Sequence, residues 1–400
     1  MHRILRIFRR TCRPFLCLRW PWLSLILLTL IILNYLGAFT HVWERNYYHE
    51  FSYPLEADIA TYVESLKHGH VPEVKPINVY NYDYLLTNDH VCRENGNPAN
   101  LRLIYLVKSA LTHSDRRNAI RRSWGYSKRF SDVNIRTVFL LGVPSEEFQQ
   151  THPKLIEEIQ LENEEFGDLI QADFEDTYFN NTIKTMMGLK WVVNFCPEAK
   201  FVVLADDDMY ISTKNMLKFI RDPFQYSDSS DAEEESRERN EVHRDRSLKR
   251  VQRNVLEISG NNSHLNLDTM LPDDHRLYAG HVFHTPPLRH WTSKWYVSLE
   301  EYPFHLWPPY VTAGTCVMSR SALMDFYYAS MYTKHFRFDD IFLGLIARKM
   351  NIEPLHSSHF YFWKKHYTPR GYSDVMASHG YHDPSELTRV WQEQKSIGSA

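Results

Sequence analysis

The sequence predicts an α/β fold in which a mostly parallel, Rossmann-like sheet is flanked by helices. Apolar runs at 101–110 and 137–142 predict strands, and each is followed by a segment with helical features. A third run at 201–205 ends abruptly at carboxylates. Strands that alternate with helices are typical of parallel sheets, which bind ligands at the carboxyl ends of their strands. The end of the third run is therefore the first candidate site.

The amino-terminal region predicts a membrane anchor ahead of this fold. Residues 20–39 form an uncharged, mainly apolar run that is long enough for a transmembrane helix. Arginines are frequent at 1–19, whereas Glu44, Arg45 and Glu50 follow the run. The positive-inside rule therefore predicts a cytosolic tail at 1–19 and a lumenal remainder. A cleaved signal peptide is the alternative, but the run exceeds a normal signal-peptide core and no clear cleavage site follows it.

The lumenal part is predicted to contain a stem and one domain. Residues 40–98 are rich in Tyr, His, Asn and Pro without sustained periodicity, which is typical of a stem. Residues 99–400 are predicted to form a single domain with a sizeable core. Within this domain, the stretch 222–275 is dense in mixed charge and poor in large apolar residues, which predicts a disordered insertion. A solvated charged helix is the alternative.

Composition narrows the class of protein further. The net charge of -3 does not favour nucleic acid as a partner. Cys92, Cys196 and Cys316 fall in the lumenal part, and three cysteines allow at most one internal disulfide. A packed core must therefore supply most of the stability, which suits an enzyme. Asn180 and Asn261 lie in Asn-x-Ser/Thr sequons and are candidate glycosylation sites.

The first predicted helix carries four arginines close to a strand end. It covers HSDRRNAIRRSWG at 113–125, where Ser114 or Asp115 is a candidate cap, and a Glu-rich helix follows at 145–165. Guanidinium groups and helix N-termini both favour phosphate oxygens. The arginines are Arg116, Arg117, Arg121 and Arg122. An exposed basic helix face is the alternative, and it stays open for the first and the last of them.

Two acidic clusters are the candidates for chemistry. Asp206, Asp207 and Asp208 follow the third strand, where a divalent cation would compensate their mutual repulsion. An acidic turn or helix cap is the alternative. Together with the arginines, such a cation indicates a nucleotide diphosphate ligand. Asp339 and Asp340 open an amphipathic segment and predict either helix capping or a general base.

An aromatic loop precedes the second acidic cluster. The stretch WPPYVTAGTCVM at 307–318 combines a rigid Pro-Pro step, aromatic side chains and small residues. This pattern is typical of a wall against which a sugar stacks, and a packed loop is the alternative. The candidate acceptor-binding residues in this loop are Trp307, Tyr310 and Gly314.

These motifs, in this order, resemble the β-1,3-glycosyltransferase family of galactosyl- and N-acetylglucosaminyltransferases. The resemblance covers about residues 101–221 and 278–393. It is carried by RRNAIRRSWG, FLLG, DTYFNNTIKT, LADDDMY, KWYVSLEEYPFHLWPPYVTAG, FDDIFLG and ASHGYHDPSELTRVW. The resemblance implies a GT-A type fold, a type II Golgi membrane topology, a UDP-sugar donor, a Mn²⁺ or Mg²⁺ ion, and inversion at the sugar carbon.

The resemblance also implies roles for single residues. Asp206 and Asp208 match the metal motif, and His379 is expected to complete the metal site, with His356 as the second choice. Asp340 matches the second acid of the family's acidic pair and is expected to be the catalytic base, with Asp339 as the first acid. Residues expected on the donor side are Arg117, Arg121, Trp124 and Asp207. Val311 stands where many relatives have Cys, which implies that a disulfide common in the family is missing here.

Two longer blocks, GHVFHTPPLRH and KWYVSLEEYPF, resemble an insect branch of the family that acts on glycolipids. They imply transfer from UDP-N-acetylglucosamine to a β-mannosyl glycolipid, with UDP-galactose as the alternative donor. A glycan acceptor, the Golgi membrane and a homodimer complete the expected partners. Two other classes are alternatives: a metal-dependent phosphohydrolase, which would need a tighter His/Asp ligand cluster, and an inert lumenal sugar-binding protein.

Overall fold

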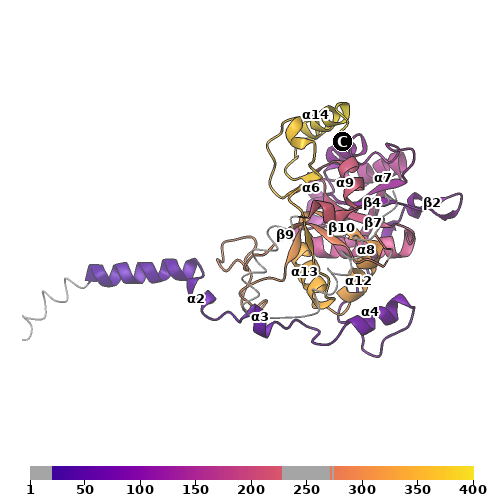
Figure 1. The fold of residues 1–400 in the computed structure, drawn as a ribbon. Coiled ribbons are helices and arrows are strands. Elements are labelled where there is room, and N and C mark those ends of the chain that lie inside the picture. The colour runs from indigo at the N-terminus through magenta and orange to yellow at the C-terminus, as the bar shows by residue number, and fades with distance from the viewer. Residues whose placement is uncertain (1–19, 228–270, 273) are drawn as a thin grey trace, which may run out of the picture. The chain divides into compact units, whose positions relative to one another are not determined.

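The computed structural model describes residues 20–227, 271–272 and 274–400 (Figure 1). Most of the insertion predicted at 222–275 lies outside these residues, as does the sequon at Asn261. The chain divides into two compact units, which are described separately. The first unit comprises Met1–Ser52 and His284–Trp307, and the second comprises Tyr53–Phe283 and Pro308–Ala400.

The first unit contains the apolar segment for which an anchor is predicted. Residues 20–35 are helical, and the short helices α2 (Ala38–His41) and α3 (Tyr47–Glu50) follow. Among the described residues, none of the helices has both the length and the apolar character needed to cross a membrane.

The second unit is built on a mixed sheet. In the part of the chain that the structure describes, this sheet has eight strands in the order β1-β6-β5-β4-β7-β10-β9-β11. The neighbours β6, β5, β4 and β7 run parallel, whereas β10 pairs antiparallel with both β7 and β9. The prediction of a mostly parallel sheet therefore holds for the centre but not for the whole. The strands of this sheet are β1 (Tyr84–Leu86), β4 (Leu103–Lys108), β5 (Ile135–Val143), β6 (Leu169–Glu175), β7 (Phe201–Asp206), β9 (Tyr278–Phe283), β10 (Tyr310–Ser319) and β11 (Leu355–His356).

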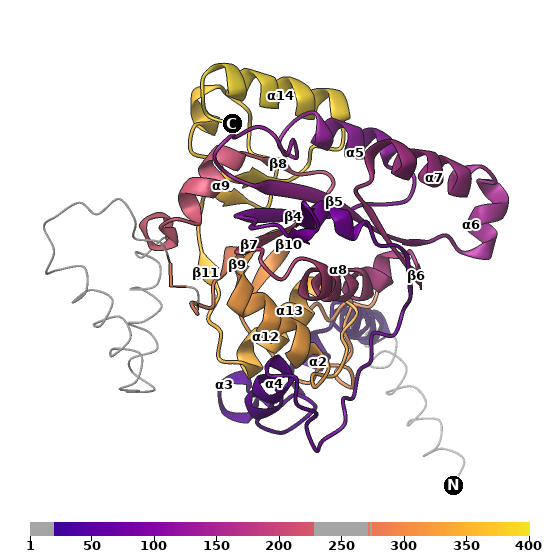
Figure 2. The same ribbon diagram turned by 90° about the vertical axis from the view of Figure 1, so that its right-hand side faces the viewer.

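Helices cover both faces of this sheet. Figure 2 shows α8, α12 and α13 on one side and α5, α7, α9 and α14 on the other. The helices of the second unit are α4 (Ala60–Lys67), α5 (Ser114–Arg121), α6 (Glu146–Thr151), α7 (Leu155–Phe166), α8 (Asn181–Phe195), α9 (Thr213–Phe219), α12 (Arg320–Ser330), α13 (Asp339–Lys349) and α14 (Pro384–Ser396), with short 3-10 turns η1 (Asp89–Cys92), η2 (Tyr178–Asn180), η3 (Pro223–Tyr226) and η4 (Arg370–Tyr372). The core lies between the sheet and these helices, because the central strands are buried along their length.

Local sequence signals located these elements well. The strands predicted at 101–110, 137–142 and 201–205 are β4, β5 and β7. The helix predicted at 145–165 is instead two helices, α6 and α7, because Pro153 lies between them and proline disfavours helical geometry in the residue before it. The cap predicted at Ser114 or Asp115 is wrong, since α5 begins at Ser114 and no side chain caps it.

Part of the segment interpreted as a stem belongs to the sheet. Strand β1 pairs antiparallel with β6, and Cys92 forms a disulfide with Cys196 at the end of α8. A short antiparallel pair, β2 (Arg93–Glu94) with β3 (Asn97–Pro98), follows. Cys316 is buried and free, so the three cysteines make one bridge, as their number allows.

A second, smaller sheet lies at the carboxyl end of β7. It has the order β12-β13-β8, formed by Phe360–Tyr361, Ala377–Ser378 and Tyr210–Ile211. Strand β13 pairs antiparallel with β8, and the pair joins Ser378 to Tyr210. This pairing brings the carboxyl-terminal part of the chain beside the residues that follow β7.

Candidate functional site

The site begins at the adjacent ends of β4 and β7. These strands are parallel, and their register places Lys108 directly beside Asp206. The Lys108 Nζ lies 2.9 Å from Asp206 Oδ1. Two side chains at the carboxyl ends of neighbouring parallel strands meet in this way because such ends share one edge of the sheet.

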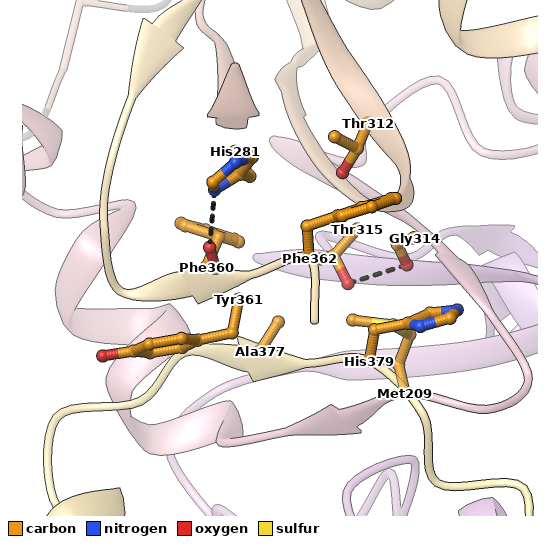
Figure 3. Close-up of a pocket in the computed structure, with 10 residues that line it drawn as sticks. All are labelled: Met209, His281, Thr312, Gly314, Thr315, Phe360, Tyr361, Phe362, Ala377 and His379. Atoms are coloured by element: carbon orange, nitrogen blue, oxygen red, sulfur yellow. Dashed lines mark hydrogen bonds between the residues drawn. The ribbon is translucent and has the colours of Figure 1, made fainter. Parts of the chain in front are cut away.

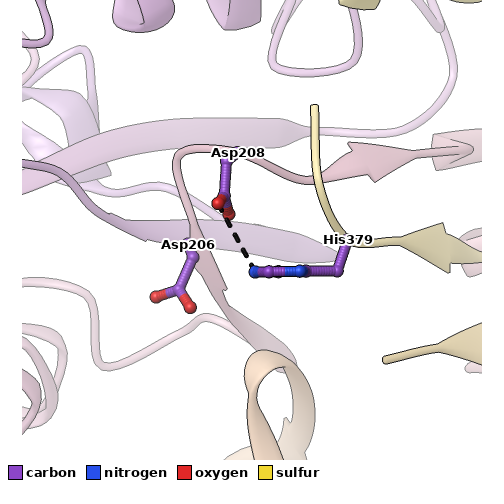
Figure 4. Close-up of side chains that lie close together, drawn as sticks. All are labelled: Asp206, Asp208 and His379. Atoms are coloured by element: carbon purple, nitrogen blue, oxygen red, sulfur yellow. Dashed lines mark ion pairs between the residues drawn. The ribbon is translucent and has the colours of Figure 1, made fainter. Parts of the chain in front are cut away.

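The β8–β13 pair supplies a histidine to the same place. Asp208 lies two residues before β8 and His379 immediately follows β13, so the pairing brings them together although they are far apart in the sequence. The backbone N–H of Tyr381 donates to the Asp208 carbonyl at 2.8 Å and holds the two segments in register. His379 Nε2 lies 3.4 Å from Asp208 Oδ2 (Figure 4).

These residues fit a hard divalent cation. Among the described residues, Asp206, Asp208 and His379 each offer one ligand atom, and these atoms all lie within 4.8 Å of one another. The Oδ1 atom of Asp208 is buried and has no hydrogen-bond partner in the described part of the chain. A buried carboxylate oxygen without a partner is costly, and a cation would satisfy it. Carboxylate oxygens suit Mn²⁺ or Mg²⁺, and because imidazole is a ligand typical of transition metals, the histidine favours Mn²⁺ of the two.

The second choice for the metal ligand, His356, is not in this cluster. The Val282 N–H donates to His356 Nδ1 at 3.0 Å, and the ring packs on His281. A different histidine does reach the cluster: His382 Nδ1 lies 3.0 Å from Asp208 Oδ2. The HGYH spacing therefore places two imidazoles on one carboxylate.

Lys108 links the first acidic cluster to the second. Its Nζ donates to Asp339 Oδ2 at 2.7 Å as well as contacting Asp206. Burial alone would lower the pKa of Lys108, but the two carboxylates raise it above its usual value. Burial raises the pKa of Asp206 to about 6, and the Lys108 charge only partly opposes this rise. One buried ammonium thus lies between a candidate metal ligand and the helix that carries the candidate base.

Asp339 and Asp340 differ sharply in their surroundings. Although burial acts against ionisation of Asp339, Lys108 and a hydrogen bond from Thr185 hold its pKa below the usual value. Burial and the neighbouring Asp339 charge instead raise the pKa of Asp340 to about 7. Asp340 accepts a 2.8 Å hydrogen bond from the Ile341 N–H through Oδ1. A carboxylate with a pKa near neutrality is suited to general-base chemistry.

Asp339 is the first residue of α13 but not its N-cap. Phe338 occupies the N-cap position, and its side chain makes no capping hydrogen bond. The carboxylate of Asp339 contacts Lys108 and Thr185. Asp339 therefore holds the buried ammonium at the start of the helix.

Asp207, expected on the donor side, fixes the loop between β4 and α5. Its carboxylate accepts hydrogen bonds from the Ser109 hydroxyl at 2.7 Å and the Ala110 N–H at 3.3 Å. His113 Nδ1 and Arg116 NH1 lie 2.8 Å and 3.0 Å from its oxygens. Burial would raise the pKa of Asp207, but His113 and these donors keep it below its usual value. The Asp207 carboxylate is thus occupied by the protein's own donors.

Arg117 and Arg121, also expected to contact the donor, are held inside the protein. Arg117 is fully buried and makes a two-bond ion pair with Glu162 at 2.8 and 2.6 Å. Arg121 pairs with Glu162 at 2.8 Å and with both oxygens of Asp168 at 2.8 and 2.7 Å. Their geometry favours a structural role. Arg116, for which a water-facing position stayed open, is the arginine of this helix that reaches the acidic cluster.

Trp124 supports the loop that carries the acidic cluster. The indole is buried, and its Nε1–H donates to the Met209 carbonyl at 2.9 Å. The Thr213 hydroxyl donates in turn to the Trp124 carbonyl at 2.9 Å. Trp124 therefore fixes the backbone that follows Asp208.

The three candidate acceptor residues are in different surroundings. In the first unit, Trp307 is buried and its ring lies 4.0 Å from that of Tyr302. In the second unit, Tyr310 is also buried and packs on Phe283. Burial of both rings favours the packed-loop alternative.

Gly314 is the candidate acceptor residue that lies beside the metal cluster. With His379 and Met209 it lines a small cavity of about 10 Å³ under an aromatic rim (Figure 3). A Cβ at this glycine would lie 3.3 Å from Met209 Sδ and 3.6 Å from His379 Cδ2. A larger side chain here would therefore press on the segment that carries His379.

Asn180 lies at the end of the turn η2, where its side-chain amide donates to the Glu175 carbonyl at 2.8 Å. The sequon threonine, Thr182, is fully buried and donates to the Phe336 carbonyl. Glycosylation at Asn180 stays a prediction.

Sequence reasoning missed Lys108, His113 and His382. Lys108 had a visible signal, because it is the one charged residue near the carboxyl end of the apolar run LRLIYLVKSA. The DTYFNNTIKT motif likewise gains a physical role. Its Thr185 contacts Asp339, and its buried Lys184 binds the Ser109 carbonyl and Asp176 at 2.7 Å each.

The comparison with known families identifies the family to which the chain belongs. A model described as galactosyltransferase matches residues 115–262 and 258–358, which together span more than half of the chain. The chain belongs to the galactosyltransferase family. It is an enzyme of the β-1,3-glycosyltransferase class, so the alternative of an inert sugar-binding protein is wrong.

Two curated members of the galactosyltransferase family are similar to most of the chain. The β-1,3-galactosyltransferase brn of Drosophila melanogaster, brainiac, is 39% identical over 377 residues, covering 94% of this chain and 96% of its own. The lactosylceramide 1,3-N-acetyl-β-D-glucosaminyltransferase A of Xenopus laevis is 31% identical over 346 residues, covering 82% and 76%. Among solved structures, the galactosyltransferase LgtC is 14% identical with a TM-score of 0.32, covering 74% of this chain and 97% of its own. A likeness at that TM-score carries no argument, so the GT-A assignment stays a prediction.

The contrast among the arginines of α5 gives a test. Arg116→Gln is expected to weaken UDP-sugar binding by about tenfold with little change in melting temperature, because it removes a half-buried charge beside Asp207. Arg121→Gln is expected to lower the free energy of unfolding by about 3–5 kcal/mol, because it leaves Glu162 and Asp168 short of a partner. Calorimetry and thermal melts measure the two effects. Arg122→Gln, at an exposed position six residues after Arg116, is the matched control and should change neither. A normal donor affinity in the Arg116 variant would contradict the assignment.

Proposed function

We propose that this enzyme transfers N-acetylglucosamine from UDP-N-acetylglucosamine in β-1,3 linkage to a β-mannosyl glycolipid, with inversion at the sugar carbon. The observation that carries the proposal is the link from Asp206 through Lys108 to Asp339, which places the metal-fitting carboxylates and the acidic pair in one site. A donor diphosphate and an acceptor hydroxyl need these two kinds of group side by side. Membership in the galactosyltransferase family supports the same chemistry.

Asp340 is proposed as the general base. Its pKa of about 7 lets the ionised carboxylate accept the proton of the acceptor 3-hydroxyl. The acceptor oxygen then forms a bond to the sugar carbon from the face opposite UDP. The bond from that carbon to the diphosphate oxygen breaks, and its electron pair leaves with UDP. A single displacement of this kind inverts the configuration at the sugar carbon.

Asp206, Asp208 and His379 are proposed to hold the divalent cation, Mn²⁺ or Mg²⁺. When bound, such an ion supplies positive charge to the diphosphate of the leaving group. Arg116 of α5 extends this positive side of the site, and His113, on the loop that precedes α5, contacts the same Asp207 carboxylate. We therefore assign the donor-side charge to Arg116, with Arg117, Arg121 and Trp124 supporting the loop.

A second donor has specific support. The Drosophila relative is named as a galactosyltransferase, whereas the Xenopus relative is named as an N-acetylglucosaminyltransferase. UDP-galactose is therefore the alternative donor for the same site and the same linkage. Both relatives are compatible with a base that activates a 3-hydroxyl.

The proposed location is the Golgi membrane, with the catalytic part in the lumen. Its support is the apolar run at 20–39 with arginines before it, together with the disulfide between Cys92 and Cys196. A disulfide is typical of an oxidising compartment.

Donor profiling tests the proposed function. The full-length enzyme is incubated with a panel of UDP-sugars and with β-mannosyl and β-galactosyl glycolipids, and the product linkage is determined by NMR. We expect N-acetylglucosamine on the 3-oxygen of mannose. Faster transfer from UDP-galactose would replace the proposed donor by the alternative, and a product linked elsewhere than the 3-oxygen would contradict the proposed acceptor geometry.

A further inference from the structure

The first unit joins two segments that are distant in the sequence. The Tyr35 and Trp291 rings meet edge to face at 5.7 Å, and the Tyr35 hydroxyl lies 2.9 Å from Thr292 Oγ1. Gly37 has a positive φ of 78°, and a Cβ there would lie 2.8 Å from the Cβ of Arg289. The end of the apolar helix at 20–35 therefore packs directly on residues 284–307.

Arg289 organises the 284–307 segment from inside. It is buried, and its Nε donates to Glu44 Oε1 at 2.7 Å. Its other nitrogens donate to four backbone carbonyls at 2.8 to 3.0 Å, those of Val297, Ser298, Tyr302 and Phe304. A guanidinium with this many acceptors fixes the loop in one shape. Residues 284–307, which contain HTPPLRH and KWYVSLEEYPF, are thus a built platform.

The platform buries some of its aromatic rings and exposes others. Tyr302, Phe304 and Trp307 are buried. Trp43, Trp291 and Trp295 are 76%, 64% and 47% exposed, and Leu288 is exposed as well. We call Leu288, Trp291 and Trp295, which lie within eight positions of the 284–307 segment, the tryptophan surface. A gathering of large apolar side chains on one unit indicates an interaction surface.

The neighbouring helix indicates what covers this surface. Every residue at 20–35 is exposed, and the exposed side chains are almost all large and apolar. A helix that is apolar all round belongs in a protein core or in lipid. Tryptophan is enriched where a bilayer meets water, because its ring is apolar and its N–H needs a polar partner. The tryptophan surface adjoins the end of that helix through the contact of Tyr35 with Trp291.

We propose that the tryptophan surface rests in the interface of the lipid bilayer, as a second membrane contact beside the apolar helix. Trp291 and Trp295 insert their rings at the level of the lipid headgroups, and Lys294, whose Nζ lies 4.4 Å from the Trp295 ring centre, faces the headgroup phosphates. The proposal rests on the membrane anchor of the proposed function. It goes beyond that function, because it assigns a lipid-binding role to residues 284–307.

Fluorescence quenching by brominated lipids tests this surface. The full-length chain is reconstituted into phosphatidylcholine vesicles whose acyl chains are brominated near the headgroup or near the chain end. We expect the parent to be quenched most by the shallow bromines, and the Trp291→Phe, Trp295→Phe double variant to lose part of that quenching. Phenylalanine keeps most of the apolar volume, and an unchanged melting temperature confirms that the unit still folds.

Trp363→Phe is the matched control. Trp363 is 76% exposed but lies outside the tryptophan surface, so its removal should leave unchanged the fluorescence intensity that the shallow bromines quench. If the double variant keeps all of the parent's quenching, the tryptophan surface does not contact lipid and the proposal is overturned. If the parent shows no quenching at all, the anchor fails together with this surface. Self-association of the parent in detergent that the double variant abolishes, without lipid quenching, would assign the surface to a second copy of the chain instead.

Discussion

Replacing Asp340 with Asn is expected to lower turnover by roughly a hundred- to ten-thousand-fold, the range that is typical for loss of a general base. Asparagine keeps the size of the side chain and can still accept the hydrogen bond from the Ile341 N–H. It cannot take up the acceptor proton. Donor affinity should change little, because Asp340 is not among the residues that fit the cation. Turnover measured at saturating donor, with calorimetry for UDP-sugar binding, separates the two effects.

Asp339→Asn is the matched variant at the neighbouring position. It removes the charge that Lys108 and Thr185 contact, so we expect a lower melting temperature and a loss of turnover of about tenfold. If Asp339→Asn abolishes transfer while Asp340→Asn stays active, the base is misassigned by one position. If both variants stay active, the base lies elsewhere.

The acidic pair also predicts a pH dependence. Asp340 must be ionised to accept a proton, and its pKa is raised to about 7. The value of kcat/KM should therefore fall as the pH drops through about 7, and it should level off above that pH. The pKa of Asp339 lies below its usual value, so Asp339 stays ionised across this range. In Asp340→Asn the residual activity should lose this acid limb, and a limb that persists unchanged would contradict the assignment.

Asp208→Ala is expected to reduce transfer by on the order of a hundred- to a thousand-fold, because a bound cation contributes several kcal/mol to stabilising the leaving group. The variant removes both an expected ligand and the buried oxygen that has no other partner among the described residues. The affinity for Mn²⁺, measured by calorimetry or by electron paramagnetic resonance, should fall in parallel. A chelator should have the same effect on the parent.

Asp173→Ala provides the control for this variant, since Asp173 is an exposed acid on β6. Its metal affinity and turnover should equal those of the parent. Undiminished turnover of the parent in metal-free buffer, or unchanged Mn²⁺ affinity of the Asp208 variant, would show that the cluster does not hold the catalytic ion.

The sequence predicted what depends on local pattern and on a run of motifs. Strand ends marked by carboxylates gave Asp206 and Asp208, because an apolar run that stops at acids is visible along the chain. The pairing of Asp208 with His379 depends on the antiparallel contact of β13 with β8. Each of these strands has only two residues, which is too short for a periodic pattern that would predict a strand. Only the family resemblance indicated His379 beforehand.

The sequence says least about which charged groups pair with one another. It left a water-facing position open for Arg116 and placed Arg117 and Arg121 on the donor side. Helix geometry instead turns Arg117 and Arg121 toward Glu162 and Asp168, and leaves Arg116 to meet Asp207. Which arginine faces which acid depends on the packing of α5 against its neighbours, and a one-residue rotation would exchange their roles. The role of Lys108 was not predicted for the same reason, because its contact with Asp206 depends on the register of β4 with β7.

The ammonium of Lys108 has a practical consequence for handling the enzyme. If a bound cation alone balanced the charge of these acids, its removal would leave carboxylates that repel one another, and the fold would be destabilised. Here a covalently tethered positive charge stays between Asp206 and Asp339 whether or not a cation is present. The metal-free enzyme should therefore stay folded but inactive during dialysis against a chelator. It should regain activity within the time of mixing when Mn²⁺ is added back.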